Sequence, residues 1–220
     1  MLESEYLKPR RLPAHLRKRP EPEAPFSFSI RPARSEDIPD IREIYNHYVM
    51  NSMVTFDEKP MTLRAWRIKF AQAGKLKHPV LVAVSPSNQV LGYAMVTPWR
   101  MRSGYRFTVE DAIYLRPAST GKGLGPALLD ALIAACREAG LRTIIAVIAD
   151  SGAESSMILH ERAGFVEVGR MGGVGYKFGR TLGTVTMQLT LKPSRPRKQP
   201  ESESQTPGSR GWRRVFGASA

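Results

Sequence analysis

The sequence predicts an α/β fold with one mixed central β-sheet and about four flanking helices. Short runs of alternating or continuous apolar residues are interspersed with longer runs in which apolar residues recur every three or four positions. A Gly-rich segment over residues 117–125 joins a predicted strand directly to a predicted helix. With 220 residues, 42% of them hydrophobic, the chain is long enough for one packed domain. We expect that domain over residues 28–191.

The first strand is predicted over residues 28–31, where apolar and polar side chains alternate. Ser35 is a predicted N-cap followed by an acidic first turn, and apolar residues then recur at helical spacing to about Val49. Thr62 is predicted to cap a second helix that carries its apolar side chains on one face.

The middle of the domain is predicted to be three strands. Residues 79–84 and 90–97 flank a turn-forming segment and predict a hairpin. Residues 107–115 predict a third strand in which side chains alternate between two faces. Glu110 and Asp111 are therefore expected on opposite faces of the sheet.

The remaining elements complete a mixed sheet. Pro126 is predicted to open a third helix that Gly140 ends, and the β-branched and apolar run over residues 143–149 is typical of a buried strand. A helix over residues 154–163 and strands over 165–168 and 182–191 follow. The predicted order is βααβββαβαββ.

The formal net charge of +13 at first suggests a nucleic-acid partner. Residues 1–27 carry +2 and residues 192–220 carry +5, and both segments are rich in Pro and lack apolar periodicity, so we expect disordered extensions there. Residues 28–191 lack a helix-turn-helix pattern or interleaved aromatic residues. Nucleic acid is therefore not an expected partner, while the basic extensions remain candidates for binding acidic partners.

A single cysteine excludes an intramolecular disulfide and a multi-cysteine metal site, and we expect no metal. No apolar run reaches the ~20 residues of a membrane helix, and the amino terminus lacks a signal-peptide pattern. We expect a cytoplasmic protein. Cys136 lies on an apolar helix stripe and is expected in the core.

Residues Thr120–Gly125, TGKGLG, are suited to holding a pyrophosphate. Glycines allow close backbone approach, and the following helix start presents free N–H groups and a positive dipole. The segment matches neither the Walker A loop nor the dinucleotide GxGxxG pattern. A tight structural turn is the alternative explanation.

Thr120–Gly125 resembles the [QR]xxGx[GA] pyrophosphate loop of the GNAT superfamily of N-acetyltransferases, with Thr120 in place of the usual Gln or Arg. The resemblance extends over residues 28–191 and is closest to the phosphinothricin and methionine sulfone N-acetyltransferase subgroup. It is carried by residues 30–33, 44–49, 55–56, 98–102, 105, 108–110 and 175–179.

This resemblance implies the GNAT fold, with parallel strands that splay apart, and acetyl-CoA as the co-substrate. It implies transfer of the acetyl group to the primary amine of a small amino-acid-like acceptor, by direct attack in a ternary complex, and a homodimer. The cofactor-binding residues it implies are Tyr114, Leu115, Thr120, Gly121, Lys122, Gly123, Leu124, Gly125 and Ser156.

The resemblance also implies two catalytic residues. Glu110 corresponds to the general base that deprotonates the substrate ammonium, and a solvent-facing glutamate is the alternative. His160 stands where most members have a tyrosine that protonates the departing thiolate, and it would do so or assist the base. A histidine that merely packs on a helix face is the competing explanation.

Arg100 and Arg102 resemble a clamp for the substrate carboxylate, because guanidinium groups suit planar anions. Tyr48, Phe56 and Tyr105 would form the walls of the acceptor pocket. Ala153, Thr181 and Gly183 depart from the asparagine, tryptophan and aspartate of the subgroup. Two other functions therefore remain open: acetylation of a protein or peptide amine, and an inactive GNAT-like module that binds acyl-CoA.

Overall fold

The computed structural model describes residues 26–192, and most of the two predicted extensions lies outside this range. The strands are β1 (Ser29–Pro32), β2 (Val80–Val84), β3 (Val90–Pro98), β4 (Thr108–Leu115), β5 (Thr143–Ala149), β6 (Val166–Lys177) and β7 (Arg180–Thr190). The helices are α1 (Ile38–Asn51), α2 (Leu63–Leu76), α3 (Leu124–Glu138) and α4 (Glu154–Arg162). The element order matches the prediction.

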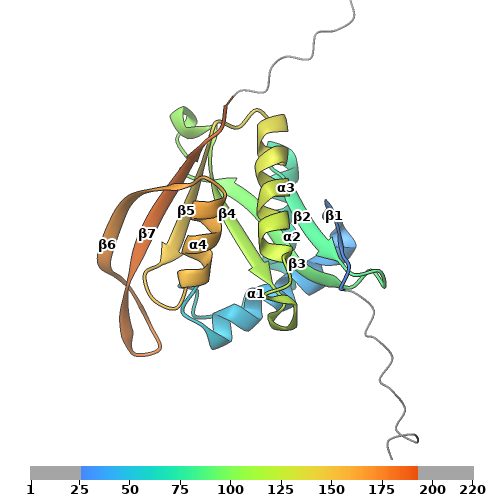
Figure 1. Cartoon of the computed structure of the whole chain (residues 1–220), viewed down its shortest axis with the longest axis horizontal. Helices are drawn as coiled ribbons and strands as arrows, with labels where there is room; N and C mark the ends of the chain where they lie inside the picture. The colour runs from blue at the N-terminus through green and yellow to red at the C-terminus, as the bar shows by residue number, and fades with distance from the viewer. Residues whose placement is uncertain (1–25, 193–220) are drawn as a thin grey trace, which may run out of the picture.

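The strands form one mixed sheet in the order β1-β2-β3-β4-β5-β7-β6 (Figure 1). Side chains alternate between its faces, as the period of two requires. Val82 and Tyr93 pack with apolar residues of α1 and α2, whereas Ala83 and Ala94 pack with α3. Each face of the sheet therefore has its own apolar core, and the predicted α/β fold is confirmed.

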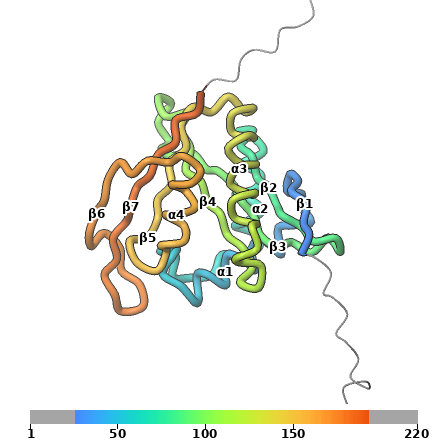
Figure 2. Tube along the Cα trace, viewed as in Figure 1, coloured from blue at the N-terminus to red at the C-terminus, as the bar shows by residue number. Residues whose placement is uncertain are grey.

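Strands β4 and β5 are parallel neighbours that stay paired over only three residue pairs. The paired segment starts at Thr108 and Thr143 and ends at Glu110 and Ile145. Beyond it the two strands diverge toward their carboxyl ends, as the backbone tubes in Figure 2 show. This is the splay that the family resemblance implies, and it begins at Glu110.

Two helix starts differ from the predictions. Residues Ser35–Asp37 form a 3₁₀ turn, so Ser35 does not cap α1. The Asp37 carboxylate instead accepts hydrogen bonds from the backbone N–H of Arg34 and from the Arg31 side chain. These bonds stabilise the tighter 3₁₀ turn ahead of α1. Helix α3 begins at Leu124, two residues before Pro126, because Gly123 takes up the left-handed conformation at its N-cap.

Strand β6 is much longer than the predicted residues 165–168. It lies at the edge of the sheet, where no helix covers it, and nearly all of its residues are exposed. Its pairing with β7 shifts register between Met171 and Gly175. Apolar residues alternate at its two ends, but Gly169, Gly172 and Gly173 interrupt the alternation in the middle, so the sequence predicts only the first part of the strand.

Candidate active site

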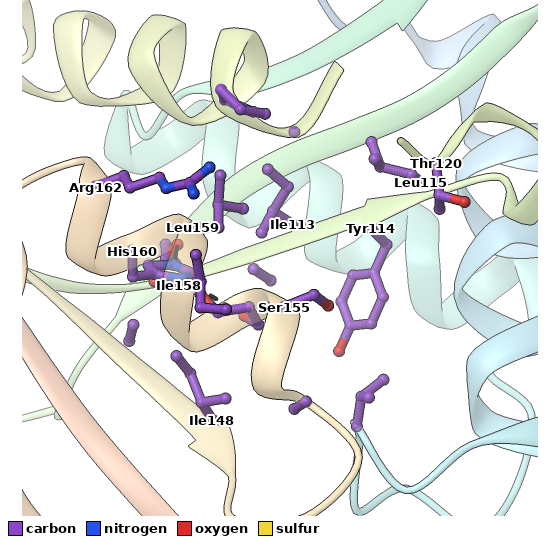
Figure 3. Close-up of a pocket in the computed structure, with 18 of the residues that line it drawn as sticks. Ile113, Tyr114, Leu115, Thr120, Ile148, Ser155, Ile158, Leu159, His160 and Arg162 are labelled. Atoms are coloured by element: carbon purple, nitrogen blue, oxygen red, sulfur yellow. Dashed lines mark hydrogen bonds and ion pairs between the residues drawn. The ribbon is translucent and has the colours of Figure 1, made fainter. Parts of the chain in front are cut away.

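A cavity of about 700 Å³ lies where β4 and β5 diverge. It extends from the Gly-rich loop at the start of α3, along β4, to helix α4 (Figure 3). Many residues predicted from the sequence line it: Tyr48, Glu110, Tyr114, Leu115, Thr120, Gly121, Gly123, Gly125, Ser156 and His160. It also contains residues that the sequence did not single out, among them Val54, Ser155, Ile158 and Arg162.

One end of this cavity is built from backbone. Gly121 and Gly123 have φ angles of 72° and 80°, in the left-handed region that favours glycine. A Cβ on either would meet nothing within 4 Å, so these glycines are required by conformation rather than by packing. The free N–H groups and positive dipole at the start of α3 lie at the same end, which is therefore suited to a pyrophosphate.

Thr120, at the position where the family usually has Gln or Arg, has a local role. Its hydroxyl donates a hydrogen bond of 2.8 Å to the carbonyl oxygen of Pro117. This bond closes the turn ahead of the glycines, so the Thr120 side chain stabilises the loop from within.

Two residues of the same segment point their side chains elsewhere. The side chain of Leu124, the first residue of α3, is buried in the apolar core between α3 and the sheet. The Lys122 ammonium lies 4.7 Å from the ring centre of Phe26. Neither contributes to the lining of the cavity. Cys136 is also buried, and burial raises the pKa of its thiol to about 12, so it is a core residue as expected.

Glu110 lies on β4 where the splay begins and lines the cavity. Burial raises the pKa of its carboxyl, and the neighbouring Asp111 carboxylate raises it further. Lys69 and Arg100 act in the opposite direction without cancelling the shift. A carboxylate with a raised pKa is a better proton acceptor, which suits a general base.

Asp111 and His160 form a buried pair on the opposite face of the sheet. Asp111 Oδ2 lies 2.9 Å from His160 Nε2, and the two side chains are 2% and 3% exposed. His160 Nδ1 lies 2.7 Å from the carbonyl oxygen of Ser156, one helical turn earlier. The alternation along β4 correctly predicts that Asp111 faces away from Glu110, but nothing in the sequence indicates its partner on α4.

The predicted acceptor-binding residues lie at three places. Tyr48 lines the cavity and donates a hydrogen bond of 2.7 Å to the carbonyl oxygen of Leu115. The Phe56 ring packs against Gly175 of β6, where an added Cβ would lie 2.6 Å from a ring carbon. Arg100, Arg102 and Tyr105 line a second cavity, of about 360 Å³, at the turn before β4.

The described residues, 26–192, contain no cluster of three or more His, Cys, Asp or Glu side chains that could hold a metal ion. Among the same residues, no helix is both long and apolar enough to cross a membrane.

Comparison with known proteins agrees with this fold and cavity. Residues 40–165 match the model of the acetyltransferase (GNAT) family. The chain is 43% identical to an L-methionine sulfoximine/L-methionine sulfone acetyltransferase of Pseudomonas paraeruginosa, over 77% of this chain and 98% of that protein. It is 41% identical to a phosphinothricin N-acetyltransferase of Alcaligenes faecalis, over 74% of this chain and 82% of the relative.

A solved structure gives the same result. A GNAT superfamily phosphinothricin acetyltransferase from Sinorhizobium meliloti, in complex with acetyl-CoA, superimposes with a TM-score of 0.72. The two sequences are 38% identical, and the match covers 77% of this chain and 94% of the other. Sequence, fold and cavity thus lead to one conclusion: the chain belongs to the GNAT family of acetyltransferases.

Proposed function

We propose that the chain transfers the acetyl group of acetyl-CoA to the primary amine of a small amino-acid-like acceptor, by direct attack in a ternary complex. The observation that carries this proposal is the cavity in the β4–β5 splay. It joins a Gly-rich helix start suited to a pyrophosphate with a carboxylate suited to deprotonating an amine.

The described residues fit acetyl-CoA. The N–H groups at the start of α3 and the left-handed glycines Gly121 and Gly123 would hold its pyrophosphate. The unpaired edges of β4 and β5 offer backbone groups along the cavity, near Tyr114 and Leu115. Acetyl-CoA supplies an activated thioester, and a backbone N–H near Tyr114 would stabilise the oxyanion that forms from it.

Glu110 is the proposed general base. An amine is mostly protonated at neutral pH and must lose a proton before it attacks a thioester. Glu110 lines the cavity and has a raised pKa because of its burial and of Asp111. It therefore accepts the ammonium proton of the acceptor, directly or through water.

The acceptor class is inferred from two kinds of support. The relatives are named for methionine sulfoximine, methionine sulfone and phosphinothricin, all of which are amino acids. Arg100 and Arg102 lie together in a small cavity before β4, and neither makes an ion pair with an acidic residue in the described range. The Arg100 guanidinium stacks on the Trp99 ring at 4.6 Å, and such stacking leaves its N–H groups able to bind an α-carboxylate together with Arg102. Tyr105 beside them, with Tyr48 and Phe56, would contact the rest of the acceptor.

The test is a thiol-release assay with acetyl-CoA against a panel of acceptors. The panel contains methionine sulfone, methionine sulfoximine, phosphinothricin, ordinary amino acids, polyamines and a peptide with a free amino terminus. We expect turnover with at least one amino acid. Turnover with the peptide alone would favour a protein acetyltransferase, and acetyl-CoA binding without thiol release would favour an inactive module.

The base is tested separately with Glu110→Gln. We expect kcat at neutral pH to fall by about 10²- to 10⁴-fold while calorimetry gives the same affinity for acetyl-CoA. Glu138→Gln, the same change at an exposed position on α3, is the matched control and retains full turnover. Unchanged turnover of Glu110→Gln would remove Glu110 from this role.

We also propose that the protein acts in the cytoplasm. We further propose that it forms a homodimer through the outer edge of β6. This edge strand and the turn after it expose a row of large apolar side chains: Val166, Val168, Met171, Val174, Tyr176 and Phe178. An uncovered apolar edge favours pairing with a second copy across a two-fold axis. Analytical ultracentrifugation tests it. We expect a dimer that Val168→Glu converts to monomer, and a wild-type monomer would refute the proposal.

A further inference from the structure

The hydrogen bonds of His160 fix how many protons its buried pair with Asp111 holds. Nδ1 faces the carbonyl oxygen of Ser156 at 2.7 Å, and a carbonyl only accepts, so Nδ1 carries a proton. Nε2 faces Asp111 Oδ2 at 2.9 Å, and this contact also needs a proton. The pair therefore holds both protons, as an imidazolium beside a carboxylate or as a neutral imidazole beside a carboxylic acid.

The surroundings favour the imidazolium. Burial lowers the pKa of His160, but the hydrogen bond and charge of Asp111, together with the Ser156 carbonyl, outweigh it and raise the pKa. Three other titratable side chains lie near the pair: Glu110 of β4, Cys136 of α3 and Arg162 of α4. Glu110 lies on the opposite face of β4, and the Cys136 thiol stays protonated because burial raises its pKa to about 12, so Asp111 is the acid that faces the imidazolium.

The ring of His160 is also held rigidly. Phe165 packs edge-on against it, with ring centres 4.9 Å apart. The second carboxylate oxygen, Asp111 Oδ1, is buried and accepts no hydrogen bond from the described residues. A buried carboxylate oxygen without a hydrogen bond lowers the stability of the fold, so a role of Asp111 in function would explain why this carboxylate is present. Both side chains line the cavity in the β4–β5 splay.

Both ring N–H groups of His160 already donate, to Asp111 and to the Ser156 carbonyl oxygen, so neither is free to protonate sulfur. We propose that Asp111 is a positioning residue for acetyl transfer: it holds His160 as a buried imidazolium, whose positive charge stabilises the departing thiolate of coenzyme A. The inference rests on the proposed function and deepens it. It assigns a role to Asp111, a residue on the face of β4 opposite the base.

The proton balance follows. The acceptor nitrogen forms a bond to the thioester carbonyl carbon, and the carbon–sulfur bond then breaks with its electron pair going to sulfur. Two protons leave the nitrogen in total, and Glu110 passes them to solvent. The thiolate takes one proton from solvent while His160 keeps both of its own, so the net release is one proton per turnover.

The protonation of His160 can be measured without any activity. The chain has four histidines, so ¹⁵N NMR of the ring nitrogens is tractable, and His160→Gln identifies the signal. We expect His160 to be doubly protonated at about pH 7, above its ordinary pKa of about 6.5, and neutral at the same pH in Asp111→Asn. A neutral His160 in the wild-type protein would overturn the proposal, whatever the enzyme acetylates.

The pH profile of kcat tests the catalytic part. Without the Asp111 charge, burial lowers the pKa of His160, so the imidazolium is lost at lower pH. The same change removes the repulsion that raises the pKa of Glu110, so the base becomes active at lower pH. Both limbs of the profile should therefore move to lower pH in Asp111→Asn, with a loss of about 10- to 100-fold at pH 8 and less at pH 6.

The control for this measurement is Asp130→Asn, the same change at an exposed position on α3, which should keep the wild-type profile. His160→Gln should lose the alkaline limb and retain the acid limb, which belongs to Glu110. A profile of Asp111→Asn that is lowered equally at every pH would assign the pair a merely structural role and overturn the proposal. If no acceptor is turned over, the proposed function fails while the NMR result still stands.

Discussion

The carboxylate of Asp150 occupies the space beside Gly183 that a side chain would otherwise fill. Asp150 Oδ1 accepts a hydrogen bond of 2.9 Å from the Gly183 N–H, and the Asp150 N–H donates to the Gly183 carbonyl oxygen at 3.1 Å. A Cβ on Gly183 would meet this carboxylate and lie 2.5 Å from the carbonyl oxygen of Met171. The glycine that departs from the subgroup is thus accompanied by an acidic group from the end of β5.

Gly183→Ala should therefore destabilise the protein. The added methyl group must displace the Asp150 carboxylate and the β6 backbone, and overpacking of this kind costs about 1–3 kcal/mol. Urea unfolding measures the loss. Gly169→Ala, on β6 where an added Cβ meets nothing within 4 Å, is the control and should change stability by less than about 0.5 kcal/mol. Equal stability of the two variants would contradict the packing argument.

Gly123→Ala should weaken acetyl-CoA binding beyond its effect on folding. The φ angle of 80° strains any L side chain, by about 1–2 kcal/mol, and the strain is relieved by moving the loop amides. Gly140, at the other end of α3, has a φ angle of 76° and equally open surroundings. Both alanine variants should lose similar stability, but calorimetry should detect a loss of affinity, about tenfold, in Gly123→Ala alone. Equal affinities would argue against the loop as the pyrophosphate site.

Asp37→Asn should destabilise the protein in a pH-dependent way. Burial tends to raise the pKa of Asp37, but hydrogen bonds from Arg31 and Arg34 outweigh it, so the pKa is lower in the folded state. The stabilisation is therefore complete above the unfolded pKa of about 3.9 and is lost as the pH falls through the lower folded value.

We accordingly expect Asp37→Asn to cost about 1–3 kcal/mol at neutral pH. The difference from wild type should shrink as the pH falls below about 4. Urea unfolding at several pH values measures it, and a difference independent of pH would show that the charge of Asp37 is not what stabilises this turn.

Arg100→Gln and Arg102→Gln should raise the KM of an amino-acid acceptor. A lost hydrogen bond between charged groups costs about 1.5–3 kcal/mol, which is about 10- to 100-fold. A second acceptor, the amine that corresponds to this amino acid without its α-carboxylate, should be acetylated equally by the wild type and by both variants. Arg106→Gln, whose guanidinium stacks on Phe107 at 4.6 Å, serves as control. A similar effect on both acceptors would mean that the arginines do not bind the carboxylate.

The fold was predictable because its pattern is local. The run over residues 143–149 predicts β5 to the residue, and the alternation along β4 correctly assigns Glu110 and Asp111 to opposite faces. The failures arise where tertiary contacts override local signals. Asp37 tightens the first turn of its segment through Arg31, and β6 continues through Gly169, Gly172 and Gly173, which interrupt the alternation that predicts a strand.

In the candidate site, too, residues with a local sequence pattern were predictable and contacts between distant residues were not. The glycines of the α3 loop are recognisable because their conformation requires glycine at those positions. The partner of His160 is not recognisable, because Asp111 lies 49 residues earlier and meets it only when α4 packs on the sheet. The separation of Arg100 and Arg102 from the larger cavity is likewise a property of the folded loop.

The brief pairing of β4 with β5 also bears on the cooperativity of unfolding. Helix α3 packs on β2, β3 and β4, whereas α4 packs on β5, so the backbone ladder between these two groups amounts to three residue pairs. Hydrogen exchange should therefore detect sub-global opening along the middle of the sheet, ahead of its interior strands β2 and β3. The two groups also share the apolar core beneath α3, and a ligand bound across the splay would connect them further.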